Sequence, residues 1–190
     1  MLTRGAAWVP VATHIPSFLN CFSSFVKDSP HNTALQNVLN YKAENTWALV
    51  RTDAKGRKTT DALAFPFTVP AALCEGQRVG LGPFTSLVDT TTSLHVAIAL
   101  LPSNDMHVSV NIQANAVQPI CAGDKVVLIS YMDKFGKRLA FVSAQLSRYR
   151  DTSEGLTGFE GLDGEKLERL CASGETLAMG RHVKCILPSK

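Results

Sequence analysis

The chain has 190 residues, of which 45% are hydrophobic and 18% are charged, a composition typical of a globular domain large enough to bury one hydrophobic core. The net charge of +3, without a long basic run, argues against nucleic acid as a partner. No run reaches the ~18 to 20 consecutive apolar residues that a membrane-spanning helix needs, so we expect no membrane span.

The five cysteines and five histidines are scattered along the chain. They include no C-x-x-C pair and no Cys/His pair at the spacing of zinc ligands. An odd number of widely spaced cysteines is typical of reduced thiols in an intracellular compartment. We therefore expect no metal site and no cofactor.

Residues 1–44 are predicted to form an N-terminal helical extension. Its helices are expected at Ser17–Lys27 and Thr33–Ala43, with Pro30 between them. The first residues of the chain lack acidic side chains and carry apolar and hydroxyl ones, which fits either a mitochondrial presequence or a helix that packs on the following domain. Mitochondrial and cytoplasmic locations both stay open, and the mitochondrial one is favoured.

Residues 45–190 are predicted to form one α+β domain. It begins with two strands, Thr46–Thr52 and Lys58–Phe67, around a turn that contains Gly56. A long helix is expected over 83–101, where apolar residues recur at i, i+3, i+4 and i+7 and extend to most faces. Such a helix must be buried on most faces, so a sheet has to curl around it and a second subunit is the simplest cover for the rest.

In the remainder of the domain, apolar and polar residues alternate with a period of two, which is typical of β-strands. Residues 149–175 interrupt this pattern as a Gly-rich surface insertion in a long hairpin, in which Asp163 is the expected N-cap of a short helix. One helix followed by consecutive antiparallel strands predicts an α+β fold rather than alternating βαβ units. The expected strands are His107–Val117, Lys125–Met132, Arg138–Arg148 and Thr176–Leu187.

Five segments, in this order, resemble motifs of one protein family. They are Thr85–Asp89, His107–Asn111, Pro119–Asp124, Gly136–Phe141 and Ala178–Lys184. Together they resemble the hotdog-fold acyl-CoA thioesterases, of the thioesterase superfamily member 2 and phenylacetate-pathway types, over roughly residues 33 to 187. The resemblance implies an antiparallel sheet wrapped around one central helix, an acyl-CoA substrate, and a homodimer or homotetramer.

The resemblance also implies roles for individual residues. Asp89 would activate a water molecule, and Ser109 would help to orient it. The backbone N–H groups of Leu81 and Gly82, at the helix N-terminus, would polarise the thioester carbonyl. Asn111 lies two residues beyond Ser109 and is expected on the same face of its strand. The residues expected to contact substrate or coenzyme A are Asn111, Pro119, Lys134, Gly136, Lys137 and Arg138.

The chain departs from the family just before the long helix. Where the family carries His-Gly-Gly, this sequence reads Gly80–Gly82 with Leu in the middle, and the position of a family Asn falls near Cys74. Pro83 removes one further N–H donor from the start of the helix. These differences fall on the part of the site that would hold the thioester carbonyl.

Two functions from different classes therefore stay open. The first is a thioesterase of lipid metabolism that hydrolyses medium- or long-chain fatty acyl-CoA to free fatty acid and coenzyme A. The second is a hotdog domain without activity that serves as a structural or binding subunit of a larger mitochondrial assembly. A dehydratase of the same fold ranks last, because it needs a His beside the carboxylate and His95 faces the apolar stripe of the helix.

Overall fold

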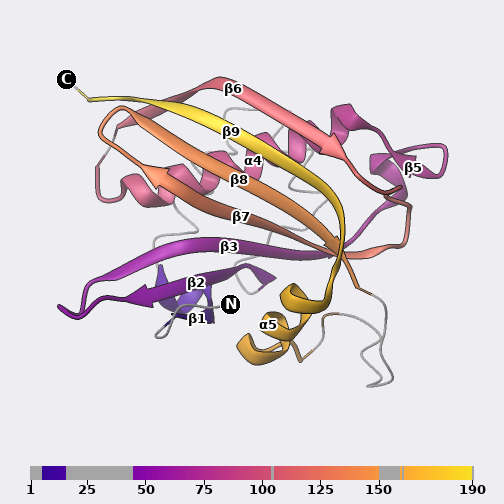
Figure 1. Cartoon of the computed structure of the whole chain (residues 1–190), viewed down its shortest axis with the longest axis horizontal. Helices are drawn as coiled ribbons and strands as arrows, with labels where there is room; N and C mark the ends of the chain where they lie inside the picture. Colours follow the sequence, from indigo (N-terminus) through magenta and orange to yellow (C-terminus); the bar gives the residue numbers. More distant parts are fainter. Residues whose placement is uncertain (1–5, 16–44, 104, 150–158, 160, 190) are drawn as a thin grey trace.

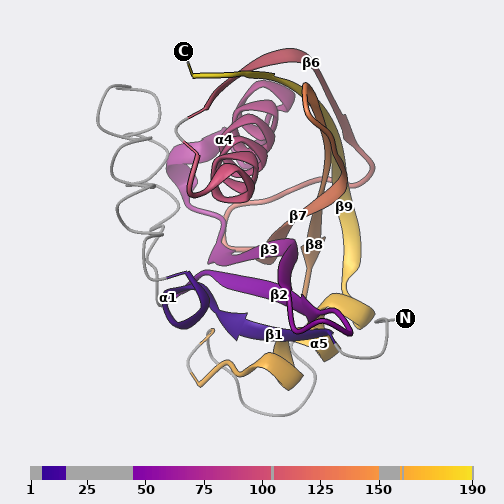
Figure 2. The same cartoon turned by 90° about the vertical axis from the view of Figure 1, so that its left-hand side faces the viewer.

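The computed structural model describes residues 6–15, 45–103, 105–149, 159 and 161–189. Its centre is a seven-stranded antiparallel sheet that curves around one long helix, α4 (Figures 1 and 2). The strand order in this sheet is β1-β2-β3-β7-β8-β9-β6. The elements are β1 (Ala6–Pro10), α1 (Val11–His14), β2 (Trp47–Thr52), β3 (Lys58–Thr68), β4 (Cys74–Glu75), β5 (Arg78–Val79), α4 (Leu81–Leu100), β6 (Met106–Ala116), β7 (Lys125–Phe135), β8 (Leu139–Arg148), α5 (Gly164–Ser173) and β9 (Glu175–Leu187).

The α+β class predicted from the sequence is confirmed, and each expected strand of the 45–190 region is present with ends shifted by three residues at most. One segment of the predicted N-terminal helical extension forms a strand in the structure. Ala6–Pro10 forms the edge strand β1, which pairs with β2 from Ala6 opposite Arg51 to Pro10 opposite Trp47. The two helices expected at 17–27 and 33–43 lie outside the described residues. No helix in the described part of the chain is long and apolar enough to cross a membrane.

Helix α4 is buried on most of its faces, as its sequence predicts. The hydroxyl groups of two buried threonines in this helix need hydrogen-bond partners. Thr91 Oγ1 donates to Leu87 O at 2.7 Å, and Thr92 Oγ1 donates to Val88 O at 2.6 Å. Back-bonding to the preceding turn therefore lets these polar side chains lie inside an apolar core.

The helix approaches strand β9 very closely at one point. A Cβ atom built on Gly180 would lie 2.7 Å from both γ-carbons of Val88, so only glycine fits there. Val88 is fully buried and belongs to the cluster that joins α4 to the inner face of the sheet. This contact fixes the distance between α4 and β9 one residue before Asp89.

A second apolar cluster lies on the outer face of β2, β3 and β7. The insertion between β8 and β9 covers it through α5, whose N-cap Asp163 accepts from the Lys166 N–H at 2.8 Å. Arg148 and Glu175 pair where the insertion leaves and rejoins the hairpin, as the sequence predicts. The buried members of this cluster are Trp8, Trp47, Leu49, Ala62, Ala64, Val127, Ile129 and Leu167.

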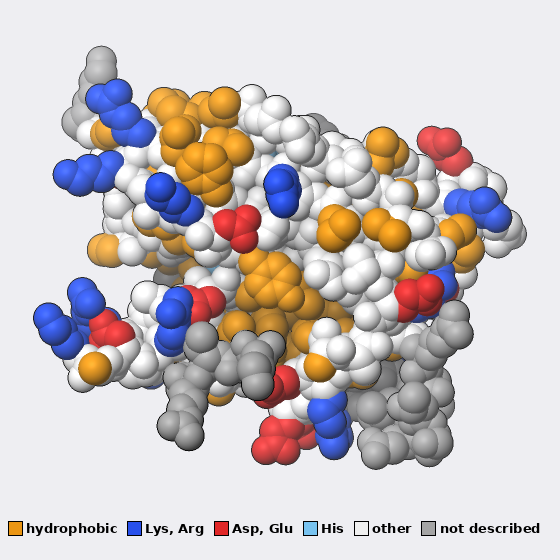
Figure 3. Space-filling model, viewed as in Figure 1, with side chains coloured by type: hydrophobic (Ala, Val, Ile, Leu, Met, Phe, Trp, Pro, Cys, Tyr) orange, Lys and Arg blue, Asp and Glu red, His pale blue; other side chains and the backbone are white. Residues whose placement is uncertain are grey.

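The other half of the outer face carries exposed apolar side chains over the ends of β6, β8 and β9. Figure 3 shows apolar side chains gathered in this region, at the upper left of the view, with basic side chains around them. Strand β6 is the edge of the sheet and pairs only with β9 among the described strands. The large exposed apolar residues of these three strands are Met106, Val108, Val110, Leu139, Phe141, Met179 and Leu187.

Candidate functional site

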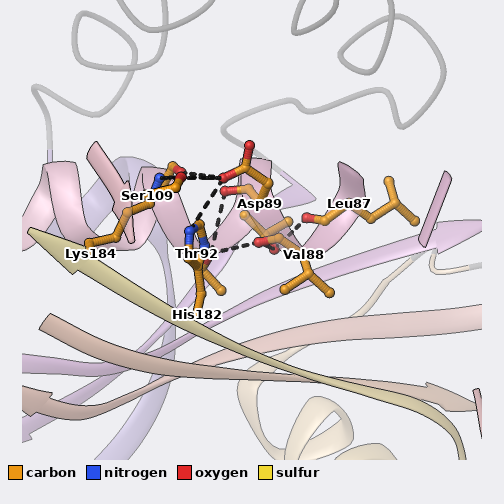
Figure 4. A network of polar contacts seen from close by, with 9 residues as sticks. Leu87, Val88, Asp89, Thr92, Ser109, His182 and Lys184 are labelled. Carbon is orange, nitrogen blue, oxygen red and sulfur yellow. Dashed lines mark hydrogen bonds and ion pairs between the residues drawn. The ribbon is translucent and has the colours of Figure 1, made fainter. Parts of the chain in front are cut away.

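Asp89 projects from the middle of α4 toward β6 and β9 (Figure 4). Its side chain is 48% exposed. Ser109 on β6 lies opposite Lys184 on β9, and both side chains reach Asp89 because both belong to the sheet face that packs on α4. The structure thus brings together two residues that the sequence associates, Asp89 and Ser109, and adds a cation to them.

All polar contacts that the described residues make with the Asp89 carboxylate fall on one oxygen. Ser93 Oγ, Ser109 Oγ and Lys184 Nζ each donate to Oδ1 at 3.3 Å, and His182 Nε2 lies 3.6 Å from the same atom. No described residue forms a hydrogen bond with Oδ2. Because the side chain is half exposed, Oδ2 is the oxygen that can accept a proton from a bound water molecule.

Lys184 is almost fully buried, with only 5% of its side chain exposed. Its ammonium group donates to Ser109 Oγ at 2.9 Å and to Asp89 Oδ1. Burial lowers the pKa of Lys184, while the nearby Asp89 carboxylate acts in the opposite direction. A cation with two polar partners on the inner face of a sheet is costly unless those partners are present, so these three side chains depend on one another.

His182 stands beside Asp89 in a defined protonation state. Its Nδ1 lies 2.7 Å from Thr92 Oγ1, and that hydroxyl already donates its proton to Val88 O. Thr92 therefore accepts from the Nδ1–H of His182, which leaves a lone pair on Nε2. Among the described residues Nε2 has no hydrogen-bond partner.

Both histidines near the carboxylate are neutral at pH 7. Burial, followed by repulsion from the Lys184 ammonium, lowers the pKa of His182 and lowers the pKa of His107 to about 4. The Asp89 charge opposes both shifts. Lys184 is therefore the one permanent cation that the described residues place against Asp89.

The first turn of α4 lies at a distance from this cluster. Leu81 and Gly82 begin the helix, about 12 Å along its axis from Asp89 at 1.5 Å per residue. Their N–H groups have no acceptor among the described residues, and a Cβ at Gly82 would meet nothing within 4 Å. Among the described residues the two N–H groups at the helix start are thus without an acceptor, and they do not reach the Asp89 carboxylate of the same chain.

The residues expected to contact coenzyme A are divided between the two ends of β9. Pro119 lies near the start of this strand, where the N–H of Gln118 donates to Leu177 O at 2.9 Å. Arg138 lies near the end of the strand, where its carbonyl accepts from the N–H of Ile186 at 2.8 Å. These ends are roughly 30 Å apart at ~3.3 Å per residue. Gly136 and Lys137 belong to the same β7–β8 turn as Arg138, and Lys134 lies at the end of β7 just before this turn.

The expectation that Asn111 shares the face of Ser109 is wrong. A β-bulge interrupts the register between these two residues, so that Ser109 lies opposite Lys184 and Asn111 lies opposite Val183. Lys184 and Val183 are consecutive in β9 and point to opposite faces of the sheet. Asn111 therefore lies on the outer face, away from Asp89.

Sequence reasoning missed Lys184, His182 and Thr92. The first two alternate along β9 at positions 182 and 184, which is the period of residues that share one face of a strand. A Lys and a His among the apolar residues of the buried face are the signal that could have identified them. Thr92 is one turn from Asp89 on α4, so its position could have been inferred from helical spacing.

Comparison with known proteins was made by sequence and by structure. No family model matches the chain, and no curated protein matches it in sequence. Its fold is similar to that of zebrafish thioesterase superfamily member 2, with a TM-score of 0.54 and 18% identity over 87% of this chain and 93% of that one. The mouse thioesterase superfamily member 2 gives a TM-score of 0.53 and 19% identity over 88% and 96%.

A bacterial structure gives the same result. The E. coli PaaI protein, from the phenylacetic acid degradation operon, has a TM-score of 0.57 and 12% identity over 92% of this chain and 96% of that one. At such identities the likeness establishes the architecture. The chain has the hotdog fold that these thioesterase structures share.

Proposed function

We propose that this hotdog domain hydrolyses the thioester bond of medium- or long-chain fatty acyl-CoA, releasing free fatty acid and coenzyme A. The observation that carries the proposal is the Asp89 carboxylate, with Oδ1 held by three donors and Oδ2 free on a half-exposed side chain. A carboxylate fixed on one side and open on the other is suited to bind and deprotonate a single water molecule. Proteins named as thioesterases share this fold.

In the proposed reaction, the water oxygen attacks the thioester carbonyl while Asp89 Oδ2 accepts the proton. The carbonyl oxygen becomes negatively charged and needs donors, which the free N–H groups of Leu81 and Gly82 can supply. The tetrahedral intermediate then loses the C–S bond, and the proton passes from Asp89 to the departing sulfur. The fatty acid releases the second proton of the water molecule to solvent and leaves as its carboxylate.

This reaction requires a second copy of the chain. Asp89 and the helix start are about 12 Å apart in one chain, too far to act on the same carbonyl group. The edge strand β6 offers the contact, because Val110 is 60% exposed there and one edge of the strand is without a partner among the described residues. Pairing of β6 with its copy would join two sheets and bring parts of both chains to one composite site.

One observation favours a second candidate, a dehydratase of the same fold. Such an enzyme uses a His beside a carboxylate, and His182 Nε2 with its free lone pair lies 3.6 Å from Asp89. Nε2 could then remove a proton from the carbon next to a thioester carbonyl and return it to the 3-hydroxyl group, which leaves as water when the C–O bond breaks. We rank this function second, because the proteins that share the fold are named as thioesterases.

The test is thiol release by the purified protein from acyl-CoA of several chain lengths, together with Asp89→Asn. We expect hydrolysis by the wild type and a loss of at least ~100-fold in the variant. Circular dichroism should show that the variant is folded, with a lower Tm because the buried Lys184 ammonium group loses its anionic partner. Incubation with a 3-hydroxyacyl-CoA, followed by absorbance of the enoyl product, tests the dehydratase. A folded wild-type protein without either activity would refute both enzymatic proposals and leave a structural or binding subunit.

A further inference from the structure

We infer that Lys184 is a positioning residue of this site, which fixes the Asp89 carboxylate through Oδ1 and turns the Ser109 hydroxyl toward it, so that Oδ2 alone serves as the base. The inference deepens the proposed hydrolysis and rests on it for its catalytic meaning. The arrangement of the three side chains can be tested independently of any activity.

The first step concerns the direction of the hydrogen bonds. An ammonium group only donates, so the 2.9 Å contact between Lys184 Nζ and Ser109 Oγ makes the hydroxyl oxygen an acceptor. The single proton of Ser109 is then directed to its other partner, Asp89 Oδ1, at 3.3 Å. Lys184 thus sets a chain of donors that runs from Nζ through Ser109 to Asp89. In this chain Ser109 orients the carboxylate rather than the water molecule.

The second step concerns the two carboxylate oxygens. Lys184, Ser109 and Ser93 all donate to Oδ1, and a carboxylate oxygen with three donors is a poor proton acceptor. Oδ2 accepts no hydrogen bond from the residues that the structure describes. Without Lys184 the carboxylate would lose its charged anchor and the group that polarises Ser109, and both oxygens would become comparable acceptors on a side chain that rotates more freely.

The third step concerns the charges around the carboxylate. The titratable groups that face Asp89 are Lys184 and His182 from β9 and His107 from β6, and burial keeps both histidines neutral. The Lys184 ammonium is therefore the charge that favours the ionised carboxylate.

The test is the chemical shift of the Asp89 side-chain carboxyl carbon at neutral pH, measured by NMR on protein labelled with carbon-13 at aspartate, in the wild type and three variants. In Lys184→Met, which removes the ammonium group that donates to Oδ1, the Asp89 signal should move away from its wild-type position. In Lys184→Arg, which keeps the cation, the signal should stay close to the wild type. Arg181→Met is the matched control, because Arg181 is exposed three residues away on the outer face of the same strand.

Kinetics supply the second measurement. In Lys184→Met kcat should fall about tenfold or more at neutral pH with little change in KM, whereas Lys184→Arg should keep most of the wild-type rate. A loss of the same size in Lys184→Met and Lys184→Arg would indicate a merely structural role. If Lys184→Met does not fold, Lys184→Gln, which keeps a donor for Ser109 but carries no charge, takes its place.

The NMR and kinetic measurements distinguish the positioning role of Lys184 from the proposed hydrolysis. An Asp89 carboxyl signal that stays unmoved in the uncharged variants overturns the role of Lys184, whatever the activity. A wild-type protein that releases no thiol, but whose Asp89 signal moves as expected in Lys184→Met, overturns the proposed hydrolysis while it supports the arrangement of Lys184, Ser109 and Asp89. A signal that moves together with a fall in kcat supports both.

Discussion

The close contact between α4 and β9 can be tested by adding one methyl group to Gly180. In Gly180→Ala the new Cβ would lie 2.7 Å from both γ-carbons of Val88, whereas carbon atoms in ordinary contact are about 3.5 to 4.0 Å apart. Val88 cannot easily rotate away, since a valine in a helix has one strongly preferred rotamer. The helix must therefore move from the strand by about 1 Å at this point.

Overpacking of this kind typically costs about 1 to 3 kcal/mol, and two simultaneous contacts with a stiff, fully buried partner place Gly180→Ala in the upper half of that range. We expect a loss of roughly 2 to 3 kcal/mol in the free energy of unfolding. For a chain of this size that corresponds to a decrease of about 4 to 12 °C in Tm. Urea denaturation and thermal unfolding measure the two quantities.

The double variant Val88→Ala/Gly180→Ala provides the control. Val88→Ala alone should cost roughly 2 kcal/mol, from two lost methyl groups and the space they leave. In the double variant the new methyl group of residue 180 fills part of that space, so the combined loss should be at least ~1 kcal/mol smaller than the sum. Additive losses, or a Gly180→Ala protein within ~0.5 kcal/mol of the wild type, would refute the contact.

Two further predictions concern acid stability and assembly. Burial lowers the pKa of His95 to about 4, below its ordinary value of 6.5. Between pH 6.5 and 4 the unfolded chain therefore binds a proton that the folded chain does not bind. Because of this difference, the free energy of unfolding falls as the pH falls. The contribution of His95 to this loss of stability reaches roughly 3 kcal/mol at about pH 4. In His95→Gln this contribution should be absent when the free energy of unfolding is measured by urea denaturation at a series of pH values. An unchanged dependence of the free energy of unfolding on pH would contradict the prediction. Val110→Lys, at the exposed edge of β6, should shift the protein from dimer to monomer in sedimentation equilibrium. The control Val117→Lys lies beyond the end of β6 and should leave the dimer intact. A dimer in both variants would argue for another interface.

The elements of the fold could be predicted from the sequence because their periodicity is local. The helix expected over 83–101 is α4, Leu81–Leu100, and the short helix after Asp163 begins where its N-cap predicts. Strand β1 escaped prediction because it has only five residues, ends at Pro10, and is defined by pairing with β2, some forty positions further along the chain. Periodicity in so short a segment gives no signal for such a distant partner.

The site was predictable only in part, for reasons that are equally physical. Asp89 and Ser109 could be associated through the family resemblance, and they lie in contact. Lys184 is 95 positions from Asp89, and a Lys in a strand is normally interpreted as solvent-exposed, so its burial could not be inferred from its residue type. Asn111 was placed on the wrong face because the bulge at Val110 has no glycine or other local marker.

The insertion between β8 and β9 also divides the outer face of the sheet into a covered and an uncovered part. Helix α5 occupies the outer face of β2, β3 and β7, so a flat sheet-to-sheet contact is sterically blocked there. Among the described residues no helix covers the outer face of β8 and β9, where Leu139, Phe141 and Met179 are exposed. A partner that stacks on the sheet would therefore bind in a position offset toward β6.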